Sequence, residues 1–101
     1  MPIVRLSPRA EADFDSIVDY LAQNAGVRIA ENYGRSIQSA VNRLSEFPAI
    51  GSPRPALAST VRVIVIAPYL IFYEVEVDNS VLVLRILHGH RKITGEMLRR
   101  T

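Results

Sequence analysis

The stretch that decides the fold is VRVIVIAPYLIFYEVEVDNSVLVLRILHGHRK, residues 61–92. Its runs of β-branched, aliphatic and aromatic residues, a composition typical of strands, are residues 61–66, 69–77 and 81–87. Ala67-Pro68 separates the first two runs, because proline removes a ladder donor. Asp78-Asn79-Ser80 separates the last two, with residues that tolerate a tight turn. Links this short make consecutive strands antiparallel neighbours, so the stretch predicts a three-stranded meander.

The first and last runs of this meander are apolar on both faces. Successive residues of a strand point to opposite faces. Leu82, Leu84 and Ile86 are therefore expected on one face of the last run, and Val81, Val83 and Leu87 on the other. Two helices cover one face of a sheet, so we expect the other face to form an exposed apolar surface for a partner. The residues expected to line it are Ile64, Ile66, Leu82, Leu84 and Ile86, or their alternates.

The chain before the meander predicts a short strand and two helices. Residues 2–6 are extended, and Ser7-Pro8 has the features of a helix start. Apolar residues with helical spacing then continue to a turn at residues 24–26. A second helix is expected from Val27 to about Phe47, with Gly34 allowing a close approach of the first helix. The Pro-rich residues 48–60 predict a loop.

The predicted order is therefore β-α-α-β-β-β, an α+β fold in a single domain spanning residues 1–101. One sheet of about four strands would carry both helices on one face. A helical hairpin is expected to return the chain to the end it left. The first strand and the strand at 61–66 are then expected to run in opposite directions.

Composition excludes several classes of protein and site. Hydrophobic residues are 49% of the chain and charged residues 22%, which is typical of a globular protein. There is no cysteine, which excludes disulfides, thiolate zinc sites and a cysteine nucleophile. No signal peptide or membrane-spanning run is recognisable, so we expect a cytoplasmic protein with no membrane contact. Net charge is +2, but residues 85–101 carry five Lys or Arg against Glu96 alone. This basic end predicts an acidic or nucleic-acid-like partner, or a solvated basic tail.

The residues with the most obvious chemistry gather near that basic end. The candidate site residues are Arg62, Arg85, His88, Gly89, His90, Arg91 and Lys92. His88 and His90 would share a strand face, but no third His or Cys exists, so no metal site is expected. Either histidine would serve as a general acid or base, or would simply close a strand end. Arginines inside apolar strands indicate either a paired residue or an outward-facing site residue. The aromatic residues Tyr69, Phe72 and Tyr73 favour core packing over base stacking.

Several short motifs together resemble the ParE branch of the RelE/ParE toxin superfamily. They are Ser7-Pro8-x-Ala10 with Asp13, Ile17 and Tyr20; Pro48-x-x-Gly51; Tyr69-x-Ile71-Phe72-Tyr73; and Leu84-Arg85-Ile86-Leu87-His88-Gly89-His90-Arg91. They extend over nearly the whole chain, and the two strand motifs are the most specific. His90 stands where such proteins often carry arginine.

The resemblance implies a small toxin, without a cofactor, that is encoded with a ParD-like antitoxin and poisons DNA gyrase. Arg85, His88, Gly89, His90, Arg91 and Lys92 would then meet the target, and the apolar face described above would meet the antitoxin. The RelE branch implies an alternative, an endoribonuclease that cleaves mRNA on the ribosome. Its candidate catalytic residues are Arg62, Arg85, His88, His90 and Arg91. Arg62 is the lone cation of the two middle strands and no aromatic follows Tyr73, so this alternative is less favoured. A third interpretation is an inactive binding module.

Overall fold

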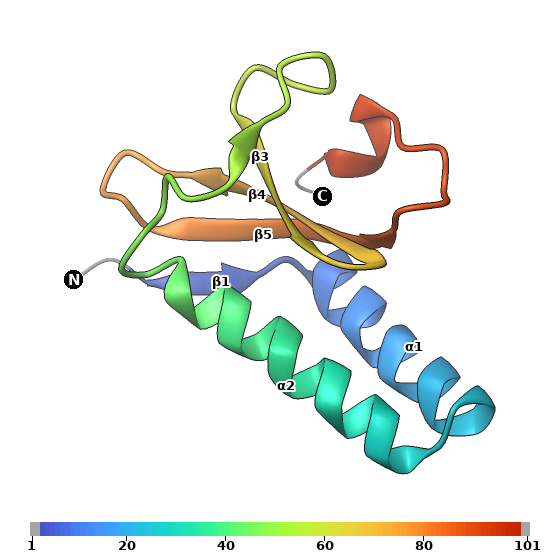
Figure 1. Ribbon diagram of the computed structural model, residues 1–101. Helices are drawn as coiled ribbons and strands as arrows, with labels where there is room; N and C mark the ends of the chain where they lie inside the picture. The colour runs from blue at the N-terminus through green and yellow to red at the C-terminus, as the bar shows by residue number, and fades with distance from the viewer. Residues whose placement is uncertain (1–2, 100–101) are drawn as a thin grey trace.

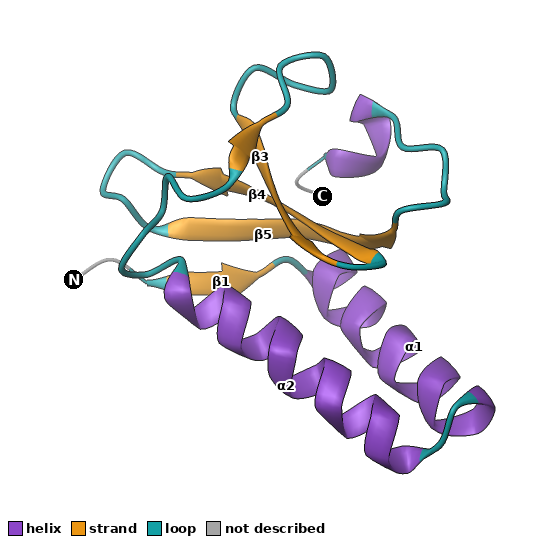
Figure 2. Ribbon diagram, viewed as in Figure 1, coloured by secondary structure: helices purple, strands orange, loops and turns teal. Residues whose placement is uncertain are grey.

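A five-stranded sheet forms the centre of the computed structural model, which describes residues 3–99 (Figures 1 and 2). Its strands are β1 (Val4–Leu6), β2 (Ser52–Pro53), β3 (Val61–Ile66), β4 (Tyr69–Val75) and β5 (Val81–His88). The order across the sheet is β1-β5-β4-β3-β2, and β3, β4 and β5 form the predicted antiparallel meander. Asn79 takes a positive φ of 67° in the β4–β5 turn. The α+β class is confirmed, and the two-residue edge strand β2 lies within the expected loop.

Two helices, α1 (Pro8–Asn24) and α2 (Val27–Arg43), cover one face of this sheet. Ser7 caps α1 as predicted, because its Oγ accepts the Ala10 N–H at 3.0 Å. α2 ends four residues before the predicted Phe47, because Leu44 and Ser45 donate to carbonyls three residues back. A short 3₁₀ helix, η1 (Gly95–Leu98), was not predicted. Pro2 of the expected first strand and Arg100 of the basic end lie outside the described residues.

The predicted direction of the first strand is wrong. β1 is parallel to β5, with Val4 opposite Val81, so it runs in the same direction as β3. The reason is the inclination of the helical hairpin across the sheet. α1 starts beside the end of β1, whereas α2 ends near the start of β1 (Figure 1). The chain therefore enters β3 at the same end of the sheet at which it entered β1.

The prediction that five aliphatic residues line one open face is also wrong. Ile64, Ile66 and Ile86 pack in the cluster beneath the helices, whereas Leu82 and Leu84 pack on the opposite face. A β-bulge causes the split. Tyr73 pairs with Val83 and Phe72 pairs with Arg85, so β5 contains one extra residue at this point. The extra residue reverses the alternation for the rest of β5.

The face of the sheet opposite the helices is covered by the chain itself. Leu57 and Ala58 from the 48–60 loop and Ile93, Met97 and Leu98 from the C-terminal segment pack there. Leu82, Leu84 and Phe72 beneath them are at most 4% exposed. A Cβ on Gly95 would overlap the carbonyl oxygen of Leu57, which shows how closely the two covering segments meet. The sheet is therefore buried on both faces, with two separate apolar clusters.

Gly34 lies against α1, but the contact does not require a glycine. A Cβ built there would lie 3.7 Å from Phe14 Cζ and 3.7 Å from Val18 Cγ2, which is ordinary van der Waals contact. We expect Gly34→Ala to raise the free energy of unfolding by about 0.5–1 kcal/mol in urea titration, because alanine favours the helix. Gly26→Ala is the control. Gly26 has a φ of 103°, which alanine adopts only with strain, so this variant should be less stable than the wild type. A loss of stability in Gly34→Ala would contradict this packing.

Candidate functional site

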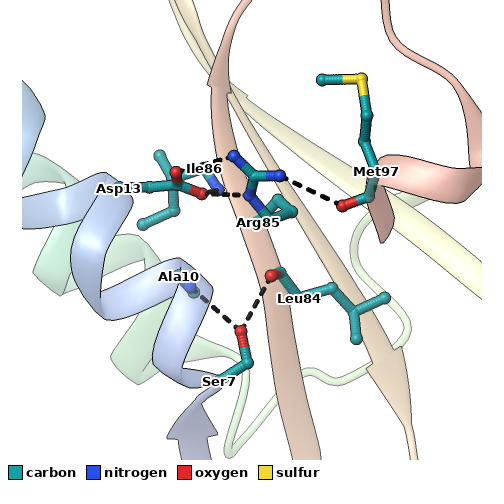
Figure 3. A network of polar contacts seen from close by, with 7 residues as sticks. All are labelled: Ser7, Ala10, Asp13, Leu84, Arg85, Ile86 and Met97. Carbon is teal, nitrogen blue, oxygen red and sulfur yellow. Dashed lines mark hydrogen bonds and ion pairs between the residues drawn. The ribbon is translucent and has the colours of Figure 1, made fainter. Parts of the chain in front are cut away.

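Arg85 joins three parts of the fold rather than facing solvent (Figure 3). Its Nε and Nη2 donate to the two carboxylate oxygens of Asp13 on α1, at 2.7 and 3.0 Å. Its Nη1 donates to the carbonyl of Met97 in η1 at 3.3 Å, and the backbone N–H of Ile86 donates to Asp13 at 2.9 Å. The Arg85 and Asp13 side chains are only 13% and 14% exposed. The hydrogen bonds to Asp13 raise the pKa of Arg85. Arg85 therefore has a structural role. It fits the paired-residue interpretation and not the outward-facing one that placed Arg85 in the target-binding set.

Arg62 likewise holds a loop in place. Its Nη1 donates to the carbonyl oxygens of Ala49 and Gly51, at 3.1 and 2.7 Å. The hydroxyl of Tyr73 accepts the Gly51 N–H and donates to the Pro48 carbonyl, both at 2.8 Å. A Cβ on Gly51 would lie 2.6 Å from that hydroxyl, so glycine is needed here. Burial raises the pKa of Tyr73. Arg62 thus orders the loop that leads into β2.

The predicted histidine pair lies at the end of β5, in a row of aromatic rings. Tyr33 of α2 meets Tyr69 of β4 edge to face, and Tyr69 meets His88 in the same way, with centroids 5.7 and 5.6 Å apart. His88 and His90 stack at 4.9 Å. The His90 backbone N–H donates to His88 Nδ1 at 3.1 Å, so a neutral His88 carries its proton on Nε2. The row leads from the buried sheet to the protein surface.

The segment His88–Lys92, which we name the basic turn, presents the exposed cations of the predicted site. Gly89 fixes its start, because its N–H donates to the Pro68 carbonyl at 2.7 Å and a Cβ there would lie 3.1 Å from the same oxygen. His90, Arg91 and Lys92 are exposed, and none of them forms an ion pair within residues 3–99. The basic turn is therefore available to a partner, unlike Arg62 and Arg85.

A cleft of about 430 Å³ opens beside the basic turn, between the helices and the β3–β4 hairpin. Its lining residues are Ser16, Ile17, Tyr20, Leu21, Tyr33, Pro68, Tyr69 and His88. Tyr20 is 63% exposed. The helical spacing of apolar residues gave no sign that Tyr20 and Tyr33 would lie beside Tyr69 at the start of β4. Tyr69 itself is buried, as predicted, and burial raises its pKa.

The five residues considered for RNA cleavage do not gather at one point. Arg62 pairs with Tyr73 across the sheet and His88 pairs with Tyr69, so their positions differ by four residues along β4. This corresponds to roughly 13 Å at the usual rise of a strand. Within residues 3–99 no group of three His, Cys, Asp or Glu side chains is placed to hold a metal ion. No helix in the described part of the chain is long and apolar enough to cross a membrane.

Comparison with known families identifies the protein family of this chain. The profile of a family described as "ParE toxin of type II toxin-antitoxin system, parDE" matches residues 4–93. The chain belongs to the ParE toxin family. Relatives include Toxin ParE1 of Caulobacter vibrioides, 37% identical over 84 residues, which are 83% of this chain and 85% of the relative. Toxin ParE3 of the same organism is 28% identical over 99 residues, 98% of this chain and 97% of the relative.

Solved structures show the same fold. A chain of the chromosomal ParDE toxin–antitoxin system from P. aeruginosa superposes with a TM-score of 0.75 at 24% identity, over 87% of this chain and 96% of that one. A chain of the RelBE2 toxin–antitoxin complex from Mycobacterium tuberculosis gives 0.64 at 20% identity, over 87% and 99%. The basic turn lies inside the ParE match, and so do Asp13, Arg85 and Ile86. The helix η1 lies beyond it.

Proposed function

We propose that this ParE-family chain is a toxin that inhibits DNA gyrase in the cytoplasm and is neutralised by a cognate ParD-like antitoxin. The basic turn is its target-binding surface. The observation that carries this proposal is the separation of the free cations from the structural arginines. Arg91 and Lys92 are exposed together beside His90, whereas Arg62 and Arg85 are occupied by carbonyl and carboxylate oxygens within the chain.

This arrangement suits binding better than RNA cleavage. Cleavage of RNA needs a base at the 2′-hydroxyl, an acid at the leaving oxygen and cations on the same phosphate. The basic turn offers two histidines, but they stack on each other and two of the expected cations are held elsewhere. A surface of exposed charge needs no proton transfer to recognise a protein target.

The antitoxin contact also changes in the light of the fold. Leu82, Leu84 and Ile86 are buried under other parts of the chain, so a partner would have to open the fold to reach them. Ile64 and Ile66 on β3 keep part of their surface exposed. Among the five predicted residues, we therefore assign direct antitoxin contact to these two alone. The solved structures of this fold come from ParDE and RelBE toxin–antitoxin systems. Their origin supports an antitoxin partner.

Arg91→Ala is expected to weaken gyrase inhibition about 10- to 100-fold, because a hydrogen bond to a charged group contributes roughly 1.5–3 kcal/mol. The measurement is the toxin concentration that halves the supercoiling activity of purified gyrase. His88→Gln and His90→Gln should have smaller effects, since charge and shape are used rather than proton transfer. Arg28→Ala on the far end of the helical hairpin is the matched control and should leave inhibition unchanged. Equal losses in Arg91→Ala and Arg28→Ala would exclude a specific role for the basic turn.

A paired assay separates the possible functions. Wild-type toxin is added to a gyrase supercoiling reaction and, separately, to a translating extract with a reporter mRNA. Inhibited supercoiling with intact mRNA supports the proposal. mRNA cleavage with untouched supercoiling would replace the proposal with the nuclease, and each histidine substitution should then cost about 10²–10⁴ in rate. If the toxin affects neither supercoiling nor mRNA, the remaining interpretation is an inactive binding module.

A further inference from the structure

A second cationic site lies where the C-terminal segment crosses the start of α1. A cleft of about 350 Å³, which we name the arginine cleft, is lined by Arg9, Arg85, Thr94, Glu96, Met97 and Arg99. It shares no residue with the basic turn. Nothing in the gyrase proposal uses it, and most of its lining comes from the segment beyond the ParE match.

The donors of the arginine cleft are largely uncommitted. Arg9 and Arg99 are exposed and form no ion pair within the described part of the chain. Thr94 occupies the N-cap position of η1, yet its side chain makes no capping hydrogen bond. Glu96 is the acidic residue that lines the cleft, and Asp13 pairs with the lining residue Arg85. Three arginines against these two carboxylates leave one net positive charge.

The fold holds these donors in place. Arg85 Nη1 donates to the Met97 carbonyl (Figure 3). Leu98 is only 4% exposed in the apolar cluster on the second face of the sheet. Gly95 meets the backbone of Leu57 too closely for a Cβ. The two ends of η1, with Thr94 and Arg99, are thereby fixed opposite the first turn of α1, which carries Arg9. The backbone that carries these side chains is therefore packed against the rest of the fold.

We propose that the arginine cleft binds a phosphate of a nucleic-acid backbone. Arginine side chains present several N–H donors in a fixed geometry that fits phosphate oxygens, and the Thr94 hydroxyl adds a neutral donor. Residues 85–101 carry a charge of +4 from five Lys or Arg against one Glu, whereas the rest of the chain sums to −2. Arg91 and Lys92 of the basic turn are separated from Thr94 by Ile93 alone. A chain of phosphates would use both groups of cations, whereas a single small anion would use one.

The test measures binding of a fluorescent duplex DNA of mixed sequence by anisotropy, with purified toxin and no gyrase, over a series of salt concentrations. Each phosphate contact contributes about 0.9 to the slope of log K against log salt. Arg9→Gln and Arg99→Gln should therefore each reduce the slope by about 0.9. Thr94→Val keeps the charge and should weaken binding about tenfold through loss of a charge-assisted hydrogen bond.

Arg28→Gln is the control, because it removes the same charge from the distant start of α2 and should leave the slope unchanged. Equal slope changes in Arg9→Gln and Arg28→Gln would overturn the site in favour of a general charge effect. Absence of duplex binding by the wild type would overturn the proposal, as would binding of inorganic phosphate without binding of duplex. Thermal denaturation of each variant must match the wild type. Because gyrase is absent, failure here leaves the gyrase proposal standing, and failure of gyrase inhibition leaves this result standing.

Discussion

Asp13→Ala is expected to lower the free energy of unfolding by about 3–5 kcal/mol, because it leaves the Arg85 guanidinium without its counter-charge in a mostly buried position. Asp13 accepts three hydrogen bonds, from Arg85 Nε, Arg85 Nη2 and the Ile86 backbone N–H. Among the described residues, Arg85 forms an ion pair with Asp13 alone. Chemical denaturation followed by circular dichroism would measure the loss.

The exposed ion pair between Arg5 and Glu76 is the natural control for this prediction. Arg5 Nη2 lies 3.1 Å from Glu76 Oε2, but the Arg5 side chain is 51% exposed. Arg5→Ala should therefore cost at most about 1 kcal/mol. The double variant Asp13→Ala with Arg85→Met should recover part of the loss, because it removes the unpaired buried charge. A cost below 1 kcal/mol for Asp13→Ala would mean that Arg85 is free to bind a partner, as the target-site interpretation expected.

The parts of the fold set by neighbouring residues were predictable. Runs of β-branched residues gave β3 its predicted bounds, and Asn79 adopts the left-handed conformation that its turn suggested. Ser7 caps α1 as expected. Each of these features depends on residues within a few positions along the chain, where backbone preferences act directly. The α+β order followed from them.

The features that depend on distant residues were not predictable. The partner of Arg85 lies 72 positions earlier, and the cover over Leu82 and Leu84 comes from a loop and a C-terminal segment without periodic pattern. The bulge in β5 has no Gly or other local signal in the sequence, so strict alternation placed Ile86 on the wrong face. The direction of β1 depended on how the helical hairpin crosses the sheet.

The same division applies to the candidate site. The exposed cations of the basic turn follow one another in the chain, and their clustering was visible in the sequence. Tyr20 and Tyr33 of the adjacent cleft come from two helices that meet the β3–β4 hairpin only in the fold. Arg9 and Arg99 of the arginine cleft are separated by nearly the whole chain. A single sequence contains no signal that brings such residues together.

Leu84→Ala is the variant that tests the second face of the sheet, and we expect it to cost about 2–5 kcal/mol. Leu84 is fully buried at the bulge, in the cluster with Phe72 and Leu98. Truncation removes apolar contacts and leaves a cavity that the covering C-terminal segment, fixed by Arg85, fills poorly.

Val65→Ala, on a strand position that is 56% exposed, is the control and should change stability by less than about 0.5 kcal/mol. Leu98→Ala should also destabilise the fold, because Leu98 is part of the cover and only 4% exposed. If Leu84 instead lay on an open surface that waits for an antitoxin, Leu84→Ala would leave the stability of the free toxin unchanged. It would then weaken only the complex. Measuring unfolding of the free chain beside antitoxin affinity distinguishes the two cases, because a buried Leu84 must show its loss before any partner is added.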